Sequence, residues 1–195
     1  MEAGQLQRTD YTVEEYLDLA MASERKLEYY NGRIELMAGG TFEHDCVKTD
    51  TAEYLTRHRK PGPCEPNSSD LAIRSEQLNS YVYPDIVYTC APPEFVSGQQ
   101  RLQLKNPTLV IEVLSGGTEA RDLGEKMAAY MSIDSLQEYV IIDSKRCFAQ
   151  GYYREATGLW RIQNRYKLGQ SLTIHTLAVD IPLAEIYRRV QFDPA

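Results

Sequence analysis

The stretch from Thr108 to Ser144 constrains the fold more than any other part of the chain. The run TLVIEVL is apolar enough to form a buried strand, the following SGG breaks that strand, and EYVIIDS forms a second buried strand. Between the two strands, residues 118–132 carry apolar side chains at helical spacing, and Thr118 can cap the start of the helix. Strands on both sides of one helix predict a mixed α/β sheet.

The remaining segments predict further helices and hairpins around this sheet. Thr12 and Glu15 have the spacing of a capping box, so a helix begins there. Asn31-Gly32 is a two-residue hairpin turn, which opposes Tyr30 to Arg33 and Leu27 to Leu36. The other expected elements are a helix over 41–59, strands over 70–76 and 81–89, C-terminal antiparallel hairpins and a last short helix near PLAEIYRRV. We expect a single domain over residues 1–195, with hairpins added at both ends.

Composition excludes some classes of protein. With 195 residues, 43% of them hydrophobic, the chain can bury a sizeable core. The net charge of -7 argues against a protein that coats nucleic acid non-specifically, and the basic run RHRK at Arg57–Lys60 is more simply a solvated helix end.

Location and redox state follow from what the sequence lacks. No apolar run reaches the roughly 18 residues of a membrane helix, and MEAGQLQRTD has no apolar signal core, so we expect a cytoplasmic protein without membrane contact. Cys46, Cys64, Cys90 and Cys147 are far apart and form no CxxC pair, which predicts four reduced, structural thiols.

Glu112 lies in the middle of the apolar run TLVIEVL, where an unpaired charge would be costly to bury. Asp85 follows Pro84, which cannot donate a ladder hydrogen bond and therefore marks a bend or a strand start. If the two strands are neighbours, the two carboxylates converge, and because like charges repel, a cation should lie between them. Mg²⁺ held by one or two carboxylates fits that demand.

Lys126 is the third candidate, on the helix that follows Glu112. The expected apolar stripe of that helix is Leu123, Met127, Tyr130 and Met131. Lys126 lies about 60° from Leu123 around the helix axis, between Asp122 and the stripe. Its ammonium can therefore reach the sheet edge and stabilise charge that develops on a phosphorus centre.

The order of these motifs resembles a known family. Pro84-Asp85, followed by the strand VIEV, is similar to the PD-(D/E)XK nuclease superfamily, although Leu114 stands where the usual lysine would be. His44, Pro84-Asp85, Val110–Ser115 and the spacing Asp122-x-x-x-Lys126-x-x-x-Tyr130 together resemble the Uma-type restriction endonuclease family of that superfamily. The resemblance covers most of the chain.

The resemblance implies a restriction-endonuclease-like fold and Mg²⁺-dependent hydrolysis of DNA phosphodiester bonds, with Mn²⁺ as a possible substitute. Asp85 and Glu112 would bind the metal, and Lys126 would replace the displaced lysine. His44 matches the family's histidine, and Glu28 matches an acid in its hairpin. A third metal ligand would come from Glu28, Glu43 or His44. Double-stranded DNA and a second copy of the chain are the implied partners.

Simpler interpretations remain open for each residue. Glu112 could cap backbone amides or pair with an arginine, Asp85 could begin a turn, and His44 could be a core histidine. Lys126 and Asp122 could form a surface ion pair, worth about 0.3–0.5 kcal/mol. Glu28 opposes Glu35 in the hairpin, and Arg33 is the cation expected beside it.

Two alternatives to the nuclease also stay open. One is a catalytically inactive DNA- or protein-binding module with the same fold, which the acidic net charge and the missing strand lysine favour. The other is an enzyme that acts on a small phosphorylated substrate, because fold alone does not define function.

Overall fold

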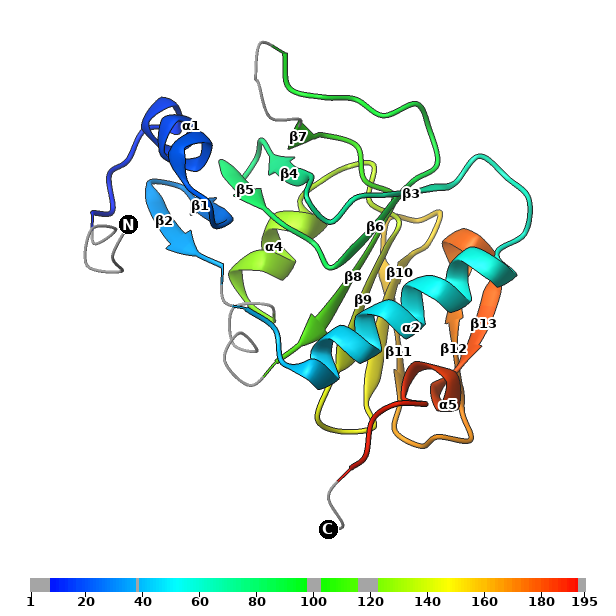
Figure 1. The fold of residues 1–195 in the computed structure, drawn as a ribbon. Coiled ribbons are helices and arrows are strands. Elements are labelled where there is room, and N and C mark those ends of the chain that lie inside the picture. Colours follow the sequence, from blue (N-terminus) through cyan, green and yellow to red (C-terminus); the bar gives the residue numbers. More distant parts are fainter. Residues whose placement is uncertain (1–7, 38, 98–102, 116–122, 193–195) are drawn as a thin grey trace.

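The structure is a computed structural model that describes residues 8–37, 39–97, 103–115 and 123–192. Figure 1 shows a mixed α/β arrangement in which α2 crosses in front of one sheet. The five-stranded sheet has the order β2-β1-β5-β4-β7, and the six-stranded sheet has the order β11-β10-β9-β8-β6-β3. Strands β12 and β13 form a separate two-stranded sheet. The predicted mixed sheet flanked by helices is therefore confirmed.

The helices are α1 (Val13–Ala22), α2 (Phe42–His58), α4 (Glu125–Met131) and α5 (Leu183–Ile186). The five-stranded sheet comprises β1 (Leu27–Tyr30), β2 (Arg33–Leu36), β4 (Ala72–Ser75), β5 (Ser80–Val82) and β7 (Gln103–Leu104). The six-stranded sheet comprises β3 (Glu65–Asn67), β6 (Ile86–Thr89), β8 (Leu109–Leu114), β9 (Glu138–Asp143), β10 (Ala149–Arg154) and β11 (Trp160–Arg165). The last sheet comprises β12 (Ser171–Ile174) and β13 (Val179–Pro182), joined by a 3₁₀ turn, η2 (His175–Leu177).

The N-terminal helix and hairpin follow the local sequence signals. Thr12 and Glu15 form both hydrogen bonds of the capping box at the start of α1. Asn31 and Gly32 have φ values of 44° and 101°, which this hairpin turn requires and which asparagine and glycine tolerate best. The pairing of β1 with β2 has the predicted register, from Leu27 opposite Leu36 to Tyr30 opposite Arg33. Its apolar face packs against α1.

The six-stranded sheet is covered on both faces. Strand β8 pairs with β9 in parallel and with β6 in antiparallel orientation. Because side chains alternate along a strand, Ile111 and Val113 pack in the core cluster that contains Val47 of α2. Val110 and Leu114 pack on the opposite face, in the cluster that contains Ala129 and Tyr130 of α4. Glu112 therefore belongs to the face that α4 covers.

One predicted strand is in fact two. The segment over 81–89 divides into β5 and β6, which belong to different sheets. Pro84 lies at the break because it lacks the N–H that a continuous ladder requires. Asp85 immediately precedes β6, so it lies where the chain crosses from one sheet to the other.

The prediction of four reduced thiols is wrong. Cys64 and Cys90 form a disulfide, because the antiparallel pairing of Glu65 with Thr89 continues by one residue to these cysteines. Cys46 and Cys147 are free thiols. The basic run at the end of α2 lies beside this disulfide, where Arg59 donates to the Cys64 carbonyl and pairs with Glu65.

Over the described ranges, the helices are too short or too polar to cross a bilayer.

Candidate active site

The chain segments that carry Asp85 and Glu112 are neighbours. In the antiparallel pairing of β6 with β8, Ile86 lies opposite Ile111 and Val87 opposite Val110. Continuing this register by one residue brings Asp85 opposite Glu112. Directly opposed residues of such a pair have Cβ atoms about 4.5–5.5 Å apart. The two strands are therefore neighbours, as the convergence of the two carboxylates requires, and the convergence itself stays a prediction.

Glu112 is buried, with 2% of its surface exposed, and its carboxylate has ionic and neutral partners. The Lys126 ammonium lies 3.0 Å from Oε1, and the Tyr130 hydroxyl donates to the same oxygen at 2.8 Å. Burial, followed by the charge of Glu112, raises the pKa of Tyr130 well above its ordinary value, so the hydroxyl stays protonated and keeps donating. The Lys126 ammonium and the Tyr130 hydroxyl thus both hold the Glu112 carboxylate in place.

Glu28 shares that cation. The Lys126 ammonium lies 3.3 Å from Oε1 of Glu28, which is equally buried. Glu28 also accepts hydrogen bonds from the Tyr30 hydroxyl at 2.9 Å and from the Tyr83 backbone N–H at 3.0 Å. Glu28 belongs to the five-stranded sheet and Glu112 to the six-stranded sheet. The two ion pairs of Lys126 therefore link the sheets.

Arg33, expected beside Glu28, lies elsewhere. Its guanidinium pairs with Glu35 at 2.8 Å and with Glu125 of α4. The expectation that Arg33 neutralises Glu28 is therefore wrong. The cause is local: Arg33 is diagonal to Glu28 along the hairpin, but its side chain reaches the nearer Glu35, two residues away on the same strand.

Helix α4 turns most of the predicted stripe inward, because Tyr130 is buried and Met127 and Met131 are partly buried against the same core cluster. The structure buries Lys126, Ala129 and Tyr130, whereas Leu123 is 40% exposed. Two buried carboxylates attract the ammonium, and the aliphatic stem of a lysine packs well among apolar side chains. Lys126 is therefore no surface residue. Thr118 and Asp122, the predicted cap and the predicted ion-pair partner, lie outside the described residues.

Asp85 receives its hydrogen bonds on one oxygen. The Val113 backbone N–H donates to Oδ2 at 2.9 Å, and Nε2 of His44 lies 3.2 Å from the same atom. Burial is the largest influence and raises the pKa of Asp85, but the His44 hydrogen bond, the charges of His44 and Lys126 and the Val113 N–H together lower it below its ordinary value. The carboxylate is thus ionised at neutral pH, and among the described residues no donor meets Oδ1.

His44 reaches Asp85 from the first turn of α2. Thr41 caps that helix by accepting from the His44 backbone N–H. Gly40 leaves room for the ring, because a Cβ there would lie 2.6 Å from Nδ1 of His44. Glu43, the neighbouring candidate, is exposed to solvent in the same turn and is not part of this buried group.

The side chains present suit a divalent cation. Glu28 and Glu112 both contact the Lys126 ammonium, and the charge of Lys126 also acts on Asp85, so three acidic side chains share one nearby lysine. The described ranges contain no cluster of three or more His, Cys, Asp and Glu side chains with metal-ligand geometry. Mg²⁺ does not need such a cage, because it is usually bound through one or two carboxylates, water and phosphate oxygens. Oδ1 of Asp85 and the carboxylate of Glu112 fit that pattern.

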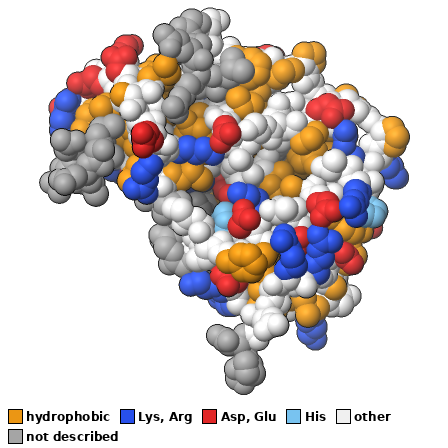
Figure 2. Space-filling view, viewed as in Figure 1, with side chains coloured by type: hydrophobic (Ala, Val, Ile, Leu, Met, Phe, Trp, Pro, Cys, Tyr) orange, Lys and Arg blue, Asp and Glu red, His pale blue; other side chains and the backbone are white. Residues whose placement is uncertain are grey.

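A groove of about 530 Å³ begins at Asp85 and runs along α2. Lys48, Thr56 and Arg57 line it from the helix, and Asn67 and Tyr88 line it from β3 and β6. Figure 2 shows a hollow on this side of the molecule, with hydrophobic side chains on its floor and charges of both signs around it. Asp85 therefore borders a groove that can hold a ligand, whereas Glu28, Glu112 and Lys126 are not among the residues that line it.

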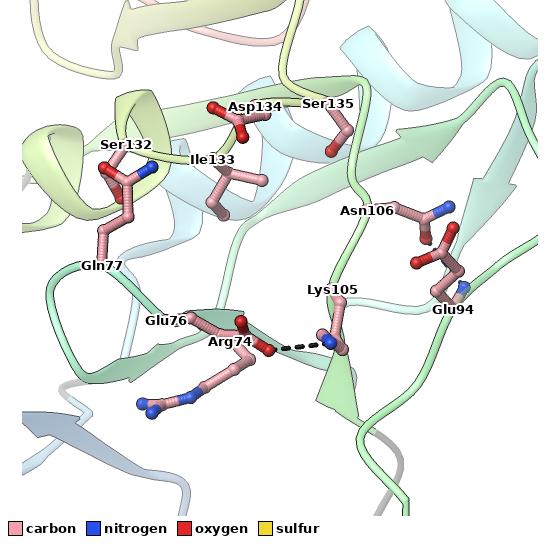
Figure 3. A pocket seen from close by; sticks show the side chains of 10 residues that line it. All are labelled: Arg74, Glu76, Gln77, Glu94, Lys105, Asn106, Ser132, Ile133, Asp134 and Ser135. Atoms are coloured by element: carbon pink, nitrogen blue, oxygen red, sulfur yellow. Dashed lines mark hydrogen bonds and ion pairs between the residues drawn. The ribbon is translucent and has the colours of Figure 1, made fainter.

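A second pocket, of about 280 Å³, lies near the C-terminal end of α4. Figure 3 shows Arg74, Lys105 and Asp134 among its lining, with Lys105 already paired to Glu76 at 2.8 Å. None of the residues that line it is Asp85, Glu112 or Lys126. The groove, which includes Asp85, is the better candidate for substrate.

Sequence reasoning assigned no role to Tyr130, and it treated Glu28 only as a possible ligand. A signal for Tyr130 was present: it follows Lys126 by four residues, so both side chains lie on the same helix face. No local sequence signal indicated the link between Glu28 and Lys126, because the two residues are 98 positions apart and lie on different elements, β1 and α4.

Comparison with known proteins agrees with this architecture. Residues 13–184 match the model of the Uma2 family, described as "Putative restriction endonuclease". The "Uncharacterized protein slr1290" of Synechocystis sp. is 32% identical over 179 residues, covering 92% of this chain and 92% of the relative. A second Synechocystis protein, "Uncharacterized protein sll1609", is 29% identical over 144 residues, covering 74% of this chain and 80% of the relative.

A solved structure shares the fold. It is described as a "putative nuclease belonging to DUF820" from Anabaena variabilis, and it superposes with a TM-score of 0.69 at 14% identity. The match covers 88% of this chain and 97% of that one. Since the family model spans most of the chain and the relatives align along nearly its whole length, the protein belongs to the Uma2 family of restriction-endonuclease-like proteins.

Proposed function

We propose that this protein is a metal-dependent endonuclease that hydrolyses phosphodiester bonds in DNA, with Mg²⁺ or Mn²⁺ as its cofactor. The observation that carries the proposal is the Lys126 ammonium, buried between Glu112 and Glu28 on the face of β8 that Asp85 borders. This ammonium takes the place of the strand lysine that Leu114 replaces. The family description and the fold of the Anabaena structure support the same chemistry.

Each side chain has a distinct role in the proposal. Asp85 and Glu112 would hold the metal, which when bound supplies a Lewis acid and lowers the pKa of its water. Lys126 would orient the attacking water and stabilise negative charge on the scissile phosphate. His44 keeps Asp85 oriented, Tyr130 does the same for Glu112, and Glu28 anchors the ammonium between the sheets.

A second copy of the chain completes the proposal. A duplex has two strands to cut, so a homodimer would present two such sites to one DNA molecule. The proposed substrate is double-stranded DNA, and its backbone would enter the groove along α2.

The direct test is cleavage of supercoiled plasmid with Mg²⁺, with Mn²⁺ and with EDTA. The wild-type protein should nick the plasmid only when a metal is present, and both Asp85→Asn and Glu112→Gln should abolish nicking. Asp134→Asn is the matched control, because it removes one acid from the second pocket and should leave nicking unchanged. Nicking that persists in both site variants would disprove the assignment.

The inactive binding module remains the second candidate, because Leu114 occupies the position of the usual lysine. Calorimetry separates the two functions. The nuclease predicts Mg²⁺ or Mn²⁺ binding that Glu112→Gln weakens, whereas the module predicts no metal binding at all.

A further inference from the structure

The groove along α2 contains an unexplained polar group. Tyr88 of β6 lines the groove, and its hydroxyl is buried without a hydrogen-bond partner in the described part of the chain. Thr56, the nearby hydroxyl, already donates its proton to the Ala52 carbonyl at 2.8 Å. Buried polar groups are normally paired. Burial raises the pKa of Tyr88, and although Thr56 is close enough to lower it, the Tyr88 hydroxyl has hydrogen-bonding capacity to spare beside the groove.

The groove also has cations at both ends. Lys48 lies one helical turn after His44, near the Asp85 end, and Arg57 lies nine residues further along α2. At 1.5 Å per residue, their backbones are about 13.5 Å apart. A stacked nucleic-acid strand carries one phosphate per about 3.4 Å, so this length spans about four phosphates.

Both cations are available to such a ligand. Arg57 pairs with Glu53 at 2.6 Å and is 66% exposed, and Lys48 lies 3.5 Å from Asp45. Exposed pairs of this kind contribute little to stability, so phosphate groups can displace the carboxylates.

The remaining polar groups of the groove suit a sugar–phosphate backbone more than a base. Thr49, Thr56 and Ser69 supply hydroxyls, and Asn67 supplies an amide whose nitrogen already donates to Thr89. Glu53 also lines the groove, and its carboxylate is paired with both Arg57 and Arg188. The one aromatic ring that lines the groove, Tyr88, belongs to a fully buried side chain and offers no face for stacking. Groups of this kind position a strand without reading its sequence.

We propose that this groove is a track for the backbone of one DNA strand, bound independently of sequence by Lys48 and Arg57 and by a hydrogen bond from Tyr88. The inference rests on the proposed function, since the track leads one strand to Asp85. It goes further by assigning the surface that binds the substrate and by predicting non-specific contacts.

The test measures binding without metal, so that cleavage plays no part. The probe is a fluorescein-labelled single-stranded DNA of mixed sequence, about 20 nucleotides long, in EDTA over a series of salt concentrations. For single strands, each phosphate contact contributes about 0.7 to the slope of log affinity against log salt, or about fivefold in affinity between 1 M and 0.1 M salt. The double variant Lys48→Ala/Arg57→Ala should therefore bind about 25-fold more weakly at 0.1 M salt and lose about 1.4 from the slope.

The control variant is Lys105→Ala/Arg161→Ala. It removes the same two charges from outside the groove, and each residue is paired with a glutamate, Glu76 and Glu155, as Arg57 is with Glu53. This variant should bind the probe as the wild-type protein does. Equal losses in both double variants would show a general charge effect and would overturn the inference.

Tyr88→Phe separates binding from folding. Removing an unpaired buried hydroxyl should leave the melting temperature unchanged or higher, while affinity for the probe falls about 2- to 13-fold, the range of one hydrogen bond. Unchanged affinity in this variant would show that Tyr88 does not bind the DNA backbone.

The outcomes also separate this inference from the proposed function. Metal-dependent nicking with normal binding by Lys48→Ala/Arg57→Ala would overturn the track and leave the nuclease intact. Binding that depends on both cations, without nicking by the wild-type protein, would keep the track and disprove the nuclease. A wild-type protein that does not bind the probe would overturn the track.

Discussion

Two buried glutamates lie on neighbouring parallel strands of the six-stranded sheet, Glu112 on β8 and Glu138 on β9. Glu112 interrupts an apolar run, Glu138 begins one, and each is almost inaccessible to solvent. Glu112 meets the Lys126 ammonium and the Tyr130 hydroxyl. Glu138 instead accepts backbone N–H groups of η2, from His175 at 2.9 Å and Thr176 at 2.8 Å.

The difference shows how a buried carboxylate can be structural or functional. Glu138 fixes the turn between β12 and β13, and burial, the largest influence, raises its pKa although the Thr176 and His175 N–H groups lower it. Glu112 shares its cation with Glu28, so two acids from different sheets meet at Lys126. A carboxylate that only satisfies backbone amides does not need other acids nearby.

The largest expected effect comes from removing the shared cation. Lys126→Met should lower the free energy of unfolding by about 3–5 kcal/mol, because Glu28 and Glu112 would then be buried without their ammonium. Urea denaturation measures this loss, and adding Glu112→Gln to the variant should restore part of it. Lys105→Met, which breaks the exposed pair with Glu76, should change stability by less than about 1 kcal/mol. A similar loss in both lysine variants would contradict a special role for Lys126.

The second-largest expected effect is on the nicking activity of variants at the two glutamates. Glu112→Gln should reduce the rate of metal-dependent nicking by on the order of 10²–10³, the scale for removing one preorganised charge from an active site. Glu138→Gln should retain the wild-type rate per folded molecule, because η2 lies outside the proposed site. Initial rates on supercoiled plasmid measure both. If the two variants lose activity equally, the contrast drawn here between the glutamates is wrong.

The neutral partner of Glu112 should have a smaller effect. Tyr130→Phe removes one hydrogen bond to a charged acceptor, which should cost about 1.5–3 kcal/mol of unfolding free energy while Lys126 still holds Glu112. Tyr152→Phe is the control, because its hydroxyl donates to the neutral Gln150 at 2.6 Å. That variant should lose only about 0.5–1.5 kcal/mol. Equal losses would show that the charge of Glu112 adds nothing to the bond.

The subtlest contrast is in the pH dependence of stability. Because the folded pKa of Glu138 is raised above 4.5, its contribution to stability is fully present below that pH and is lost as pH rises through the folded pKa. Glu138→Gln removes this titration, so the stability of the wild-type protein relative to the variant should fall as pH rises.

Asp85 should behave in the opposite way. Its folded pKa is depressed below 3.8, so its contribution is present above that pH and is lost as pH falls through the folded value. Urea denaturation of the wild-type protein, Glu138→Gln and Asp85→Asn, at a series of pH values around 3.8 and 4.5, measures both trends in the free energy of unfolding. A wild-type protein whose stability relative to Glu138→Gln rises with pH would contradict the assignment for Glu138.

Local signals predicted much of the fold. The Asn31-Gly32 turn determined the register of the first hairpin, Thr41 and Arg59 bound α2 as expected, and β8 has the predicted faces. A cation beside Glu112 was also predictable, because a carboxylate inside an apolar strand needs an opposite charge nearby, and Lys126 lies 3.0 Å from it. These features depend on residues that are close in sequence or on strands that follow each other in the sheet.

The rest depends on contacts between distant segments. The division of residues 81–89 between two sheets, the inward rotation of Lys126 toward Glu28 and the disulfide all require the docking of one sheet against the other or the register of the edge strand β3. Periodicity within a single segment contains no information on such contacts. The burial of Lys126 beside the apolar stripe of α4 was missed for the same reason, since it depends on two carboxylates that are distant in the sequence.

The Cys64–Cys90 bond has a practical consequence for every measurement on this protein. It joins the edge strand β3, which forms one side of the groove, to β6, which leads to Asp85. A buffer that contains a dithiol would cleave the bond and leave β3 attached by its hydrogen bonds to β6 and by the ion pair between Arg59 and Glu65. Purification with and without reducing agent therefore yields two preparations that differ beside the groove along α2, and results from one should not be pooled with results from the other.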